Sequence, residues 1–144
     1  MIKIICIGKL KEQYLKEGIN DYQKRINKYH KLEIIELLDS NIDKEKELIL
    51  KNINHKDYII TLDIEGTNIS SKELANKLDK TFITNPNITF IIGGSDGLHQ
   101  DIKKLSNYSL SFSKLTFPHG LFRLILLEQL YRSFKILNNE SYHK

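Results

Sequence analysis

Apolar and polar residues follow two different periods along the chain. Short apolar runs and one alternating segment predict five strands, which span Ile2–Ile7, Leu32–Leu38, Tyr58–Leu62, Ile88–Ile92 and Tyr108–Phe112. Between the strands, apolar residues recur at three- and four-residue steps, which predicts amphipathic helices. This alternation predicts an α/β fold, with a mostly parallel sheet and helices on both of its faces.

The predicted helices differ in how much of their surface is apolar. They cover Tyr14–Tyr29, Ile42–Ile53, a segment that begins with the capping box Ser70–Glu73, a short segment through Ile102 and Leu105, and His119 to about Asn138. The last helix is apolar on more than one face, whereas a surface helix of a monomer needs only one apolar stripe. We therefore expect a homodimer in which the sheet covers one face of this helix and a second subunit covers another.

A glycine-rich turn, Gly93-Gly94-Ser95-Asp96-Gly97, follows the fourth predicted strand. Its three glycines allow backbone N–H groups to approach a ligand closely. Ligands of open α/β sheets bind at the carboxyl ends of strands. We therefore expect one composite pocket, formed by this turn, the predicted loop Asp63–Thr67 and the loop after Phe112. The simpler alternative is a tight strand-to-helix turn that Ser95 or Asp96 caps.

The turn after the first strand has a different composition. It offers only Gly8, followed by Lys9, whereas a dinucleotide-binding fold carries its glycines at this place. The sequence also has neither the Gly-Lys-Ser/Thr phosphate loop nor the Gly-x-Ser-x-Gly turn that presents a nucleophilic serine. These patterns argue against the common nucleotide-binding and hydrolase classes.

Length and composition indicate the number of domains, the possible partners and the compartment of the protein. A chain of 144 residues predicts one domain, residues 1–144. There are 22 Lys and Arg residues against 18 Asp and Glu, and this net charge of +4 permits an anionic partner without requiring one. Cys6 is the single cysteine, which predicts a buried thiol in a reducing compartment and no metal site. No apolar run approaches a signal-peptide core or a membrane span, so we expect a cytoplasmic protein.

Four motifs in the second half of the chain carry a family resemblance. They are Ile91–Leu98, Leu110–His119, Glu128–Arg132 and the terminal Tyr142–Lys144. In order and spacing they resemble ribosomal large-subunit methyltransferase H, a family of the SPOUT class. The resemblance implies a SPOUT (α/β knot) fold with a C-terminal trefoil knot, a homodimer, and S-adenosylmethionine as cofactor. It also implies methylation of N3 of a pseudouridine in 23S ribosomal RNA on the assembled ribosome. From the composition, we expect no metal and no membrane partner.

The same resemblance assigns cofactor contacts. The residues concerned are Leu62, Gly93, Gly94, Phe112, Ser113, Lys114, Leu115, Thr116 and Phe117. Their chemistry fits this role, because adenine and methionine moieties need an apolar slot edged by backbone donors and acceptors. The sulfonium makes the methyl group electrophilic, so the protein mainly has to align the donor with the acceptor.

The acceptor nitrogen holds a proton. The enzyme has to remove this proton or stabilise the anion that develops on the nitrogen. Candidates are His143 and Tyr142 on the polar tail, which can reach a partner's pocket, and Arg132 on the last helix. The simpler alternatives are a frayed terminus and a plain i, i+4 ion pair between Arg132 and Glu128. His119, at the start of the same helix, is either a further candidate or a structural cap.

Two other functions remain open from the sequence. One is a SPOUT methyltransferase that acts on transfer RNA, and the other is a non-catalytic RNA- or nucleotide-binding α/β module. Arg123 is a candidate to bind a phosphate or the cofactor carboxylate. Lys9, Lys11 and Lys114, near strand ends, are candidates to contact an RNA backbone.

Overall fold

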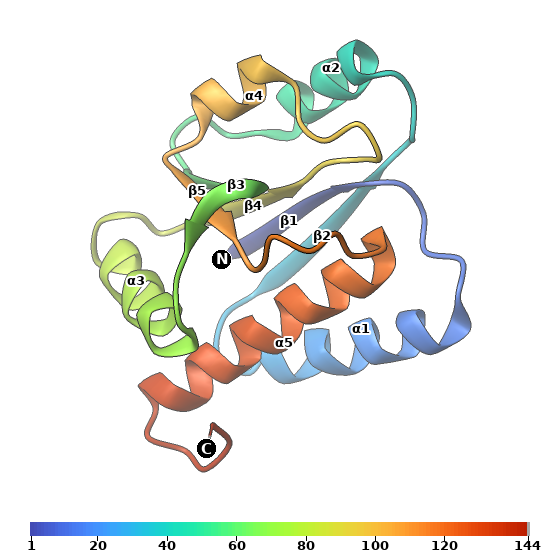
Figure 1. Cartoon of the computed structure of the whole chain (residues 1–144). Coiled ribbons are helices and arrows are strands. Elements are labelled where there is room, and N and C mark those ends of the chain that lie inside the picture. The colour runs from blue at the N-terminus through green and yellow to red at the C-terminus, as the bar shows by residue number, and fades with distance from the viewer. Residues whose placement is uncertain (144) are drawn as a thin grey trace.

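The computed structural model describes residues 1–143, and its centre is a five-stranded sheet (Figure 1). Strands and helices alternate along the chain as predicted. The strands are β1 (Ile2–Ile7), β2 (Leu32–Leu37), β3 (Tyr58–Asn68), β4 (Ile88–Ile92) and β5 (Tyr108–Ser111). The helices are α1 (Gln13–Ile26), α2 (Ile42–Asn52), α3 (Ser71–Thr84), α4 (Gln100–Leu105) and α5 (His119–Leu137).

The sheet has the strand order β2-β1-β4-β3-β5, and every pair of neighbouring strands is parallel. All residues of β4 are buried, as are five of the six in β1. Strands covered on both faces have no reason to alternate apolar and polar residues, which explains their continuous apolar runs. The predicted sheet, with its parallel strands and helices on both faces, is confirmed.

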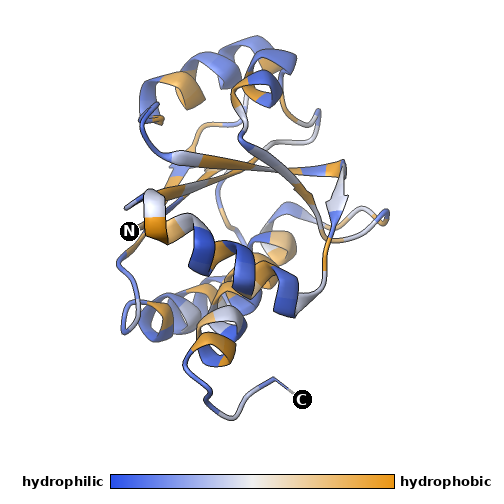
Figure 2. Cartoon of the chain, turned by 90° about the vertical axis from the view of Figure 1, so that its left-hand side faces the viewer, coloured by the Kyte–Doolittle hydropathy of each residue, from blue (hydrophilic) through white to orange (hydrophobic). Residues whose placement is uncertain are grey.

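The helices form two layers on opposite faces of the sheet, as Figure 1 shows. Helices α1, α3 and α5 pack on one face, around a core that includes Phe90 and Leu127. Helices α2 and α4 cover the other face, where Ile49 and Ile102 pack on Ile91. Figure 2 shows the apolar segments of these helices turned toward the sheet and polar segments on the outside. The buried thiol of Cys6 lies in the larger core, as predicted.

Strand β3 is longer than predicted, because the segment Asp63–Thr67 continues it instead of forming a loop. The pairing with β5 shifts register between Leu62 and Thr67, where β3 bulges. At Gly66 the two backbones come so close that a Cβ would lie 2.8 Å from the carbonyl oxygen of Ser109. The polar composition predicted a loop, whereas a β-bulge admits such residues without ending the strand.

Helix α5 is partly enclosed by its own chain. It packs between α1 and α3 as well as on the sheet, so several of its apolar residues already have partners within the chain. Leu121 at its start is nevertheless 36 % exposed, and Ile125 one turn later is half-buried. The apolar excess of α5 is therefore smaller than the sequence indicates, and the homodimer stays a prediction.

Candidate functional site

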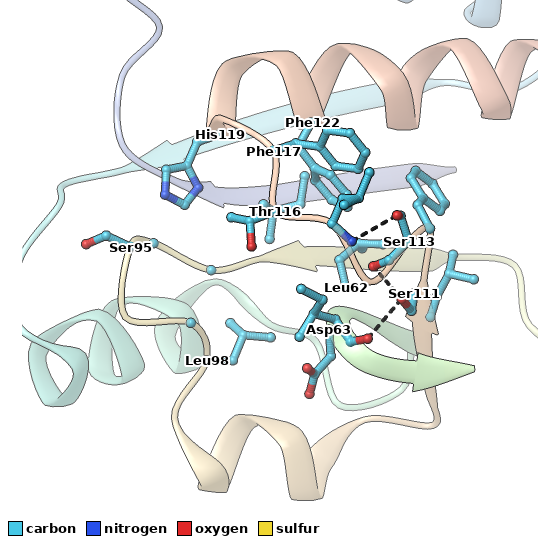
Figure 3. Close-up of a pocket in the computed structure, with 18 of the residues that line it drawn as sticks. Leu62, Asp63, Ser95, Leu98, Ser111, Ser113, Thr116, Phe117, His119 and Phe122 are labelled. Atoms are coloured by element: carbon cyan, nitrogen blue, oxygen red, sulfur yellow. Dashed lines mark hydrogen bonds between the residues drawn. The ribbon is translucent and has the colours of Figure 1, made fainter. Parts of the chain in front are cut away.

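The structure forms a cavity of about 680 Å³ at the carboxyl edge of the sheet. Its walls come from the bulge of β3, the loop after β4, the end of β5 with the loop that follows it, and the start of α5. Figure 3 shows Thr116, Phe117 and Phe122 on one side of the cavity and Leu62, Asp63 and Leu98 on the other. A volume of this size and a mainly apolar lining are typical of a small-molecule site.

The glycine-rich turn after β4 forms one wall of the cavity. Its ends are joined by an antiparallel bridge between Gly94 and Gly97, in which the Gly97 N–H donates to the Gly94 carbonyl at 3.0 Å. Gly97 has a φ of +75°, which favours glycine. At Gly93 an added Cβ would lie 2.7 Å from the Gly97 carbonyl oxygen. The turn therefore has a compact form that side chains at these positions would not allow.

The loop after β5 forms the opposite wall. Ser111 binds the carbonyl oxygens of Ile64 and Ser113, both at 3.1 Å, and the Leu115 N–H donates to Ser113 Oγ at 3.0 Å (Figure 3). Phe122 of α5 packs against two rings of this segment, Phe112 at 5.3 Å and Phe117 at 6.2 Å between ring centroids. These contacts fix the loop as an apolar wall with its backbone groups at the surface.

One ion pair lies in the lining. Asp63, at the bulge of β3, is 3.1 Å from Lys103 Nζ on α4, and its second oxygen accepts the Glu65 N–H at 3.1 Å. Sequence reasoning missed this pair, because its residues are 40 positions apart and no local pattern joins them. It also missed Leu98 and Phe122 as lining residues, which are ordinary apolar positions in the sequence.

The structure gathers almost all of the predicted cofactor residues. Those that line the cavity are Leu62, Gly93, Gly94, Phe112, Ser113, Leu115, Thr116 and Phe117. Lys114 lies on the same loop and is exposed, but it is not part of the lining. The loop after β1, with Gly8, is not part of the lining either. The predicted cavity position, in the late loops and not the first one, is therefore found in the structure.

The predicted catalytic residues come together elsewhere. Arg132 donates from Nε to Glu128 at 3.0 Å, its Nη1 lies 3.0 Å from His143 Nδ1, and Tyr142 donates to Glu128 at 3.2 Å. The i, i+4 pair of Arg132 with Glu128 is thus present, and the tail to His143 packs on its own chain. Lys144 lies outside the described residues.

Several contacts hold Tyr142. Its ring meets that of Tyr131 edge-on at 5.0 Å between centroids, and the Arg132 guanidinium lies 4.9 Å from the ring centre. Burial, followed by the hydrogen bond with Tyr22, raises the pKa of Tyr142. The hydrogen bond with Glu128 is the main cause that raises the pKa of Arg132. The raised pKa values keep the Arg132 guanidinium charged and the Tyr142 phenol neutral at neutral pH.

The tail cluster and the cavity lie at opposite ends of α5. His119 and Phe122 line the cavity near the start of this helix, and Arg132 follows Phe122 after 10 residues. At 1.5 Å per residue, Phe122 and Arg132 are about 15 Å apart along the axis. In one chain, the predicted catalytic residues therefore do not line the cavity.

From the sequence, Arg123 is a candidate to bind a phosphate or the cofactor carboxylate, but the structure places it outside the cavity. Its side chain is 3 % exposed, and it pairs with Glu36 and donates to the Gly8 carbonyl at 3.2 Å. It is not part of the cavity lining, and its Nε has no hydrogen-bond partner among the described residues. Arg123 therefore ties α5 to the ends of β1 and β2.

These features define a class of protein. The fold is an α/β sheet whose cavity is built from the bulge of β3 and the loops after β4 and β5, without a glycine-rich turn after β1. Within residues 1–143, no group of His, Cys, Asp or Glu side chains has the arrangement of a metal site. Over the same residues, none of the helices combines the length and apolarity needed to span a bilayer.

Comparison with known proteins shows to which family the chain belongs. The family described as "Predicted SPOUT methyltransferase" matches residues 1–143. The chain belongs to the SPOUT methyltransferase family, and it is therefore assigned as a methyltransferase.

The chain also matches particular relatives over nearly its whole length. It is 50 % identical to the "Ribosomal RNA large subunit methyltransferase H" of Clostridium botulinum (strain Alaska E43 / Type E3) and 47 % identical to the protein of that name from Acetivibrio thermocellus. Each match covers 99 % of both chains. The family resemblance seen in the four sequence motifs is thus confirmed.

Solved structures agree on the fold. A probable methylase family protein from Haemophilus influenzae Rd KW20 matches with a TM-score of 0.59 and 16 % identity, over 99 % of this chain and 70 % of that one. A tRNA (m1G37) methyltransferase from Aquifex aeolicus matches with a TM-score of 0.53 and 16 % identity, over 91 % and 69 % of the two chains. At this identity the likeness concerns the fold alone.

Proposed function

We propose that the protein transfers a methyl group from S-adenosylmethionine to ribosomal RNA of the large subunit. Family membership and the names of relatives about half identical to this chain support the reaction and the substrate. The observation that carries the proposal is the cavity at the carboxyl edge, which is lined by eight of the nine residues that the family resemblance assigns to the cofactor.

The cavity fits S-adenosylmethionine by its shape and chemistry. Leu62, Leu115 and Phe117 offer apolar surface for an adenine ring. Gly93 and Gly94 line the cavity and have no side chains, so they contribute backbone groups to its wall for the polar parts of the ligand. The cofactor supplies an electrophilic methyl group on a positively charged sulfur. The lining also includes Phe112 and Phe122, and aromatic rings attract cations.

The proposed active site needs two chains. Arg132 lies about 15 Å along α5 from Phe122 in the cavity lining, and Tyr142 and His143 pack beside Arg132, so a second subunit would bring its tail cluster to this cavity. The apolar residues Leu121 and Ile125 on the outer side of α5 support a homodimer that covers this helix.

Within this dimer, the tail residues would handle the acceptor. His143 would accept the proton of the acceptor nitrogen as a general base, and Arg132 beside it would stabilise the anion that forms. Tyr142 would orient the pair through its contacts with Glu128 and Arg132. His119 at the cavity rim remains a second candidate for the proton transfer.

The finer assignments rest on the family resemblance of the sequence motifs. They are N3 of a pseudouridine in 23S ribosomal RNA as the target, the assembled ribosome as the substrate, and the cytoplasm as the place of action. The resemblance also implies one domain, residues 1–144, with a C-terminal trefoil knot. The joint position of the loops after β4 and β5, which both line the cavity, supports the knot.

Methyl transfer from radiolabelled S-adenosylmethionine tests the proposal. Substrates are unmethylated ribosomes, free ribosomal RNA and transfer RNA, and we expect label only on the ribosomes. A SPOUT enzyme of transfer RNA would label the last substrate instead, and a non-catalytic module would label none.

Substitution of the tail tests the assignment of catalytic residues. His143→Ala should bind the cofactor with unchanged affinity but lose rate by about 100-fold or more, the usual contribution of a proton-transfer group. Ser141→Ala, at an exposed neighbouring position, serves as the control. Unchanged turnover of the His143 variant would remove the tail from the mechanism.

A further inference from the structure

A second feature of the carboxyl edge is a surface that the proposed methyl transfer does not use. It comprises the exposed side chains of Lys9, Lys11, Tyr14 and Lys16, in the loop after β1 and the first turn of α1, and is called the Lys9–Lys16 surface below. Tyr14 is 67 % exposed, although Leu15 beside it is buried in the core. Among the ion pairs of residues 1–143, none involves the three lysines.

The Lys9–Lys16 surface borders the cavity. At Gly120, the second residue of α5, an added Cβ would lie 2.7 Å from Leu15 Cδ1 and 2.9 Å from Leu10 Cδ2. Leu10 and Leu15 therefore pack directly on the start of α5. The preceding residue, His119, lines the cavity. A large substrate with one group in the cavity would consequently extend over this surface.

The loop that carries Lys9 and Lys11 is held in place by hydrogen bonds to Arg123 and Glu36. Gly8 adopts a φ of +96°, and its carbonyl oxygen accepts from Arg123 at 3.2 Å. The Leu10 N–H donates to Glu36 Oε2 at 3.2 Å, and the same carboxylate pairs with Arg123. A buried arginine costs desolvation energy, so this network contributes little to stability by itself. We therefore attribute it to the need to hold the loop after β1 in one position.

From this placement we infer that the Lys9–Lys16 surface binds the RNA around the methylated nucleotide. This inference rests on the proposed function. The lysines would bind phosphates, which dominate the affinity of proteins for nucleic acids. Tyr14 would stack on an unpaired base, as aromatic side chains do in proteins that bind single-stranded RNA. The fixed loop would present both groups in one position and so lower the entropic cost of binding.

The salt dependence of binding to unmethylated ribosomes tests the lysines. In the double variant Lys9→Ala and Lys11→Ala, the slope of log K against log salt should become shallower by about 1.4, the value for two lost phosphate contacts to a single strand. The control is Lys28→Ala with Lys80→Ala, which removes the same charge from exposed positions at the ends of α1 and α3. The control should leave the slope unchanged.

Tyr14 has a separate signature in the same assay. Tyr14→Ala should weaken ribosome binding by about tenfold with an unchanged salt slope, because stacking involves no counterion release. Both surface variants should keep the wild-type affinity for S-adenosylmethionine, measured by calorimetry. They should also keep the wild-type oligomeric state in sedimentation.

Three results would overturn the inference. Surface variants that bind ribosomes as the control does would show that the surface takes no part in RNA binding. A change of oligomeric state in Tyr14→Ala would make it a contact between subunits. A wild-type protein that binds S-adenosylmethionine but methylates no ribosomes would refute the proposed substrate, and the RNA surface with it. The first result leaves the proposed function intact, so the two failures are distinguishable.

Discussion

Replacement of Gly93 by alanine tests the role of the glycine-rich turn in cofactor binding. In the structure, the new Cβ would lie 2.7 Å from the Gly97 carbonyl oxygen, 2.8 Å from the Gly97 carbonyl carbon and 3.0 Å from Leu98 Cδ2. The first two are backbone atoms that cannot rotate away. The alanine therefore has to displace the turn, which forms a wall of the cavity.

The size of this displacement sets the expected loss of affinity. An ordinary contact begins at 3.4 Å, so the Cβ and the Gly97 oxygen have to separate by about 0.7 Å. Overpacking of this kind costs about 1–3 kcal/mol. If the displaced turn meets the cofactor, the dissociation constant for S-adenosylmethionine should rise by roughly 5- to 150-fold.

Isothermal titration calorimetry with S-adenosylmethionine measures this effect. Gly8→Ala is the matched control, because Gly8 has a φ of +96° but open space around its Cβ position and lies outside the cavity lining. This control should lose about 1–2 kcal/mol of stability with unchanged cofactor affinity. A Gly93 variant that binds the cofactor within twofold of wild type would refute the role of the turn.

Three further predictions concern the framework of the site. Gly66→Ala should lower the free energy of unfolding in urea by about 1–3 kcal/mol, because its Cβ would lie 2.8 Å from the Ser109 carbonyl oxygen; an unchanged midpoint would contradict the tight β3–β5 contact. Arg123→Met should cost about 1–3 kcal/mol in the same assay, because the Gly8 carbonyl oxygen and Glu36 lose their hydrogen-bond donor, and a stabilised variant would contradict this view of the network. Burial raises the pKa of Glu45 above its usual value of 4.5, so the native state retains a proton that the unfolded state loses, and stability should fall as the pH rises through this window. Glu45→Gln should remove that fall in thermal unfolding at several pH values, and an identical pH profile would contradict it.

Much of the fold was predictable because its signals are local. The apolar runs of Ile2–Ile7 and Ile88–Ile92 gave both strands within their observed bounds, since burial on both faces removes alternation. The capping box of Ser70 and Glu73 marked the start of α3, where both of its hydrogen bonds are present. The carboxyl-edge cavity followed from the position of Gly93 after a parallel strand.

Features that depend on distant residues were not predictable. The continuation of β3 through Asp63–Thr67 depends on β5, which passes so close that only Gly66 fits. The anchoring of Arg123 depends on Glu36, which lies 87 positions earlier in the sequence. The docking of Tyr142 on its own chain depends on contacts with α1 and α5, and a polar tail sequence carries no signal of them.

The central claim is that the bulge of β3 and the loops after β4 and β5 bind S-adenosylmethionine. A crystal structure of the protein with S-adenosylhomocysteine, the product of methyl transfer, tests this claim most directly. We expect the ligand between Leu62, Gly93 and Thr116, with its adenine against the apolar wall of the cavity. A ligand bound at the Gly8 loop, or a crystal soaked at saturating concentration with an empty cavity, would contradict the account.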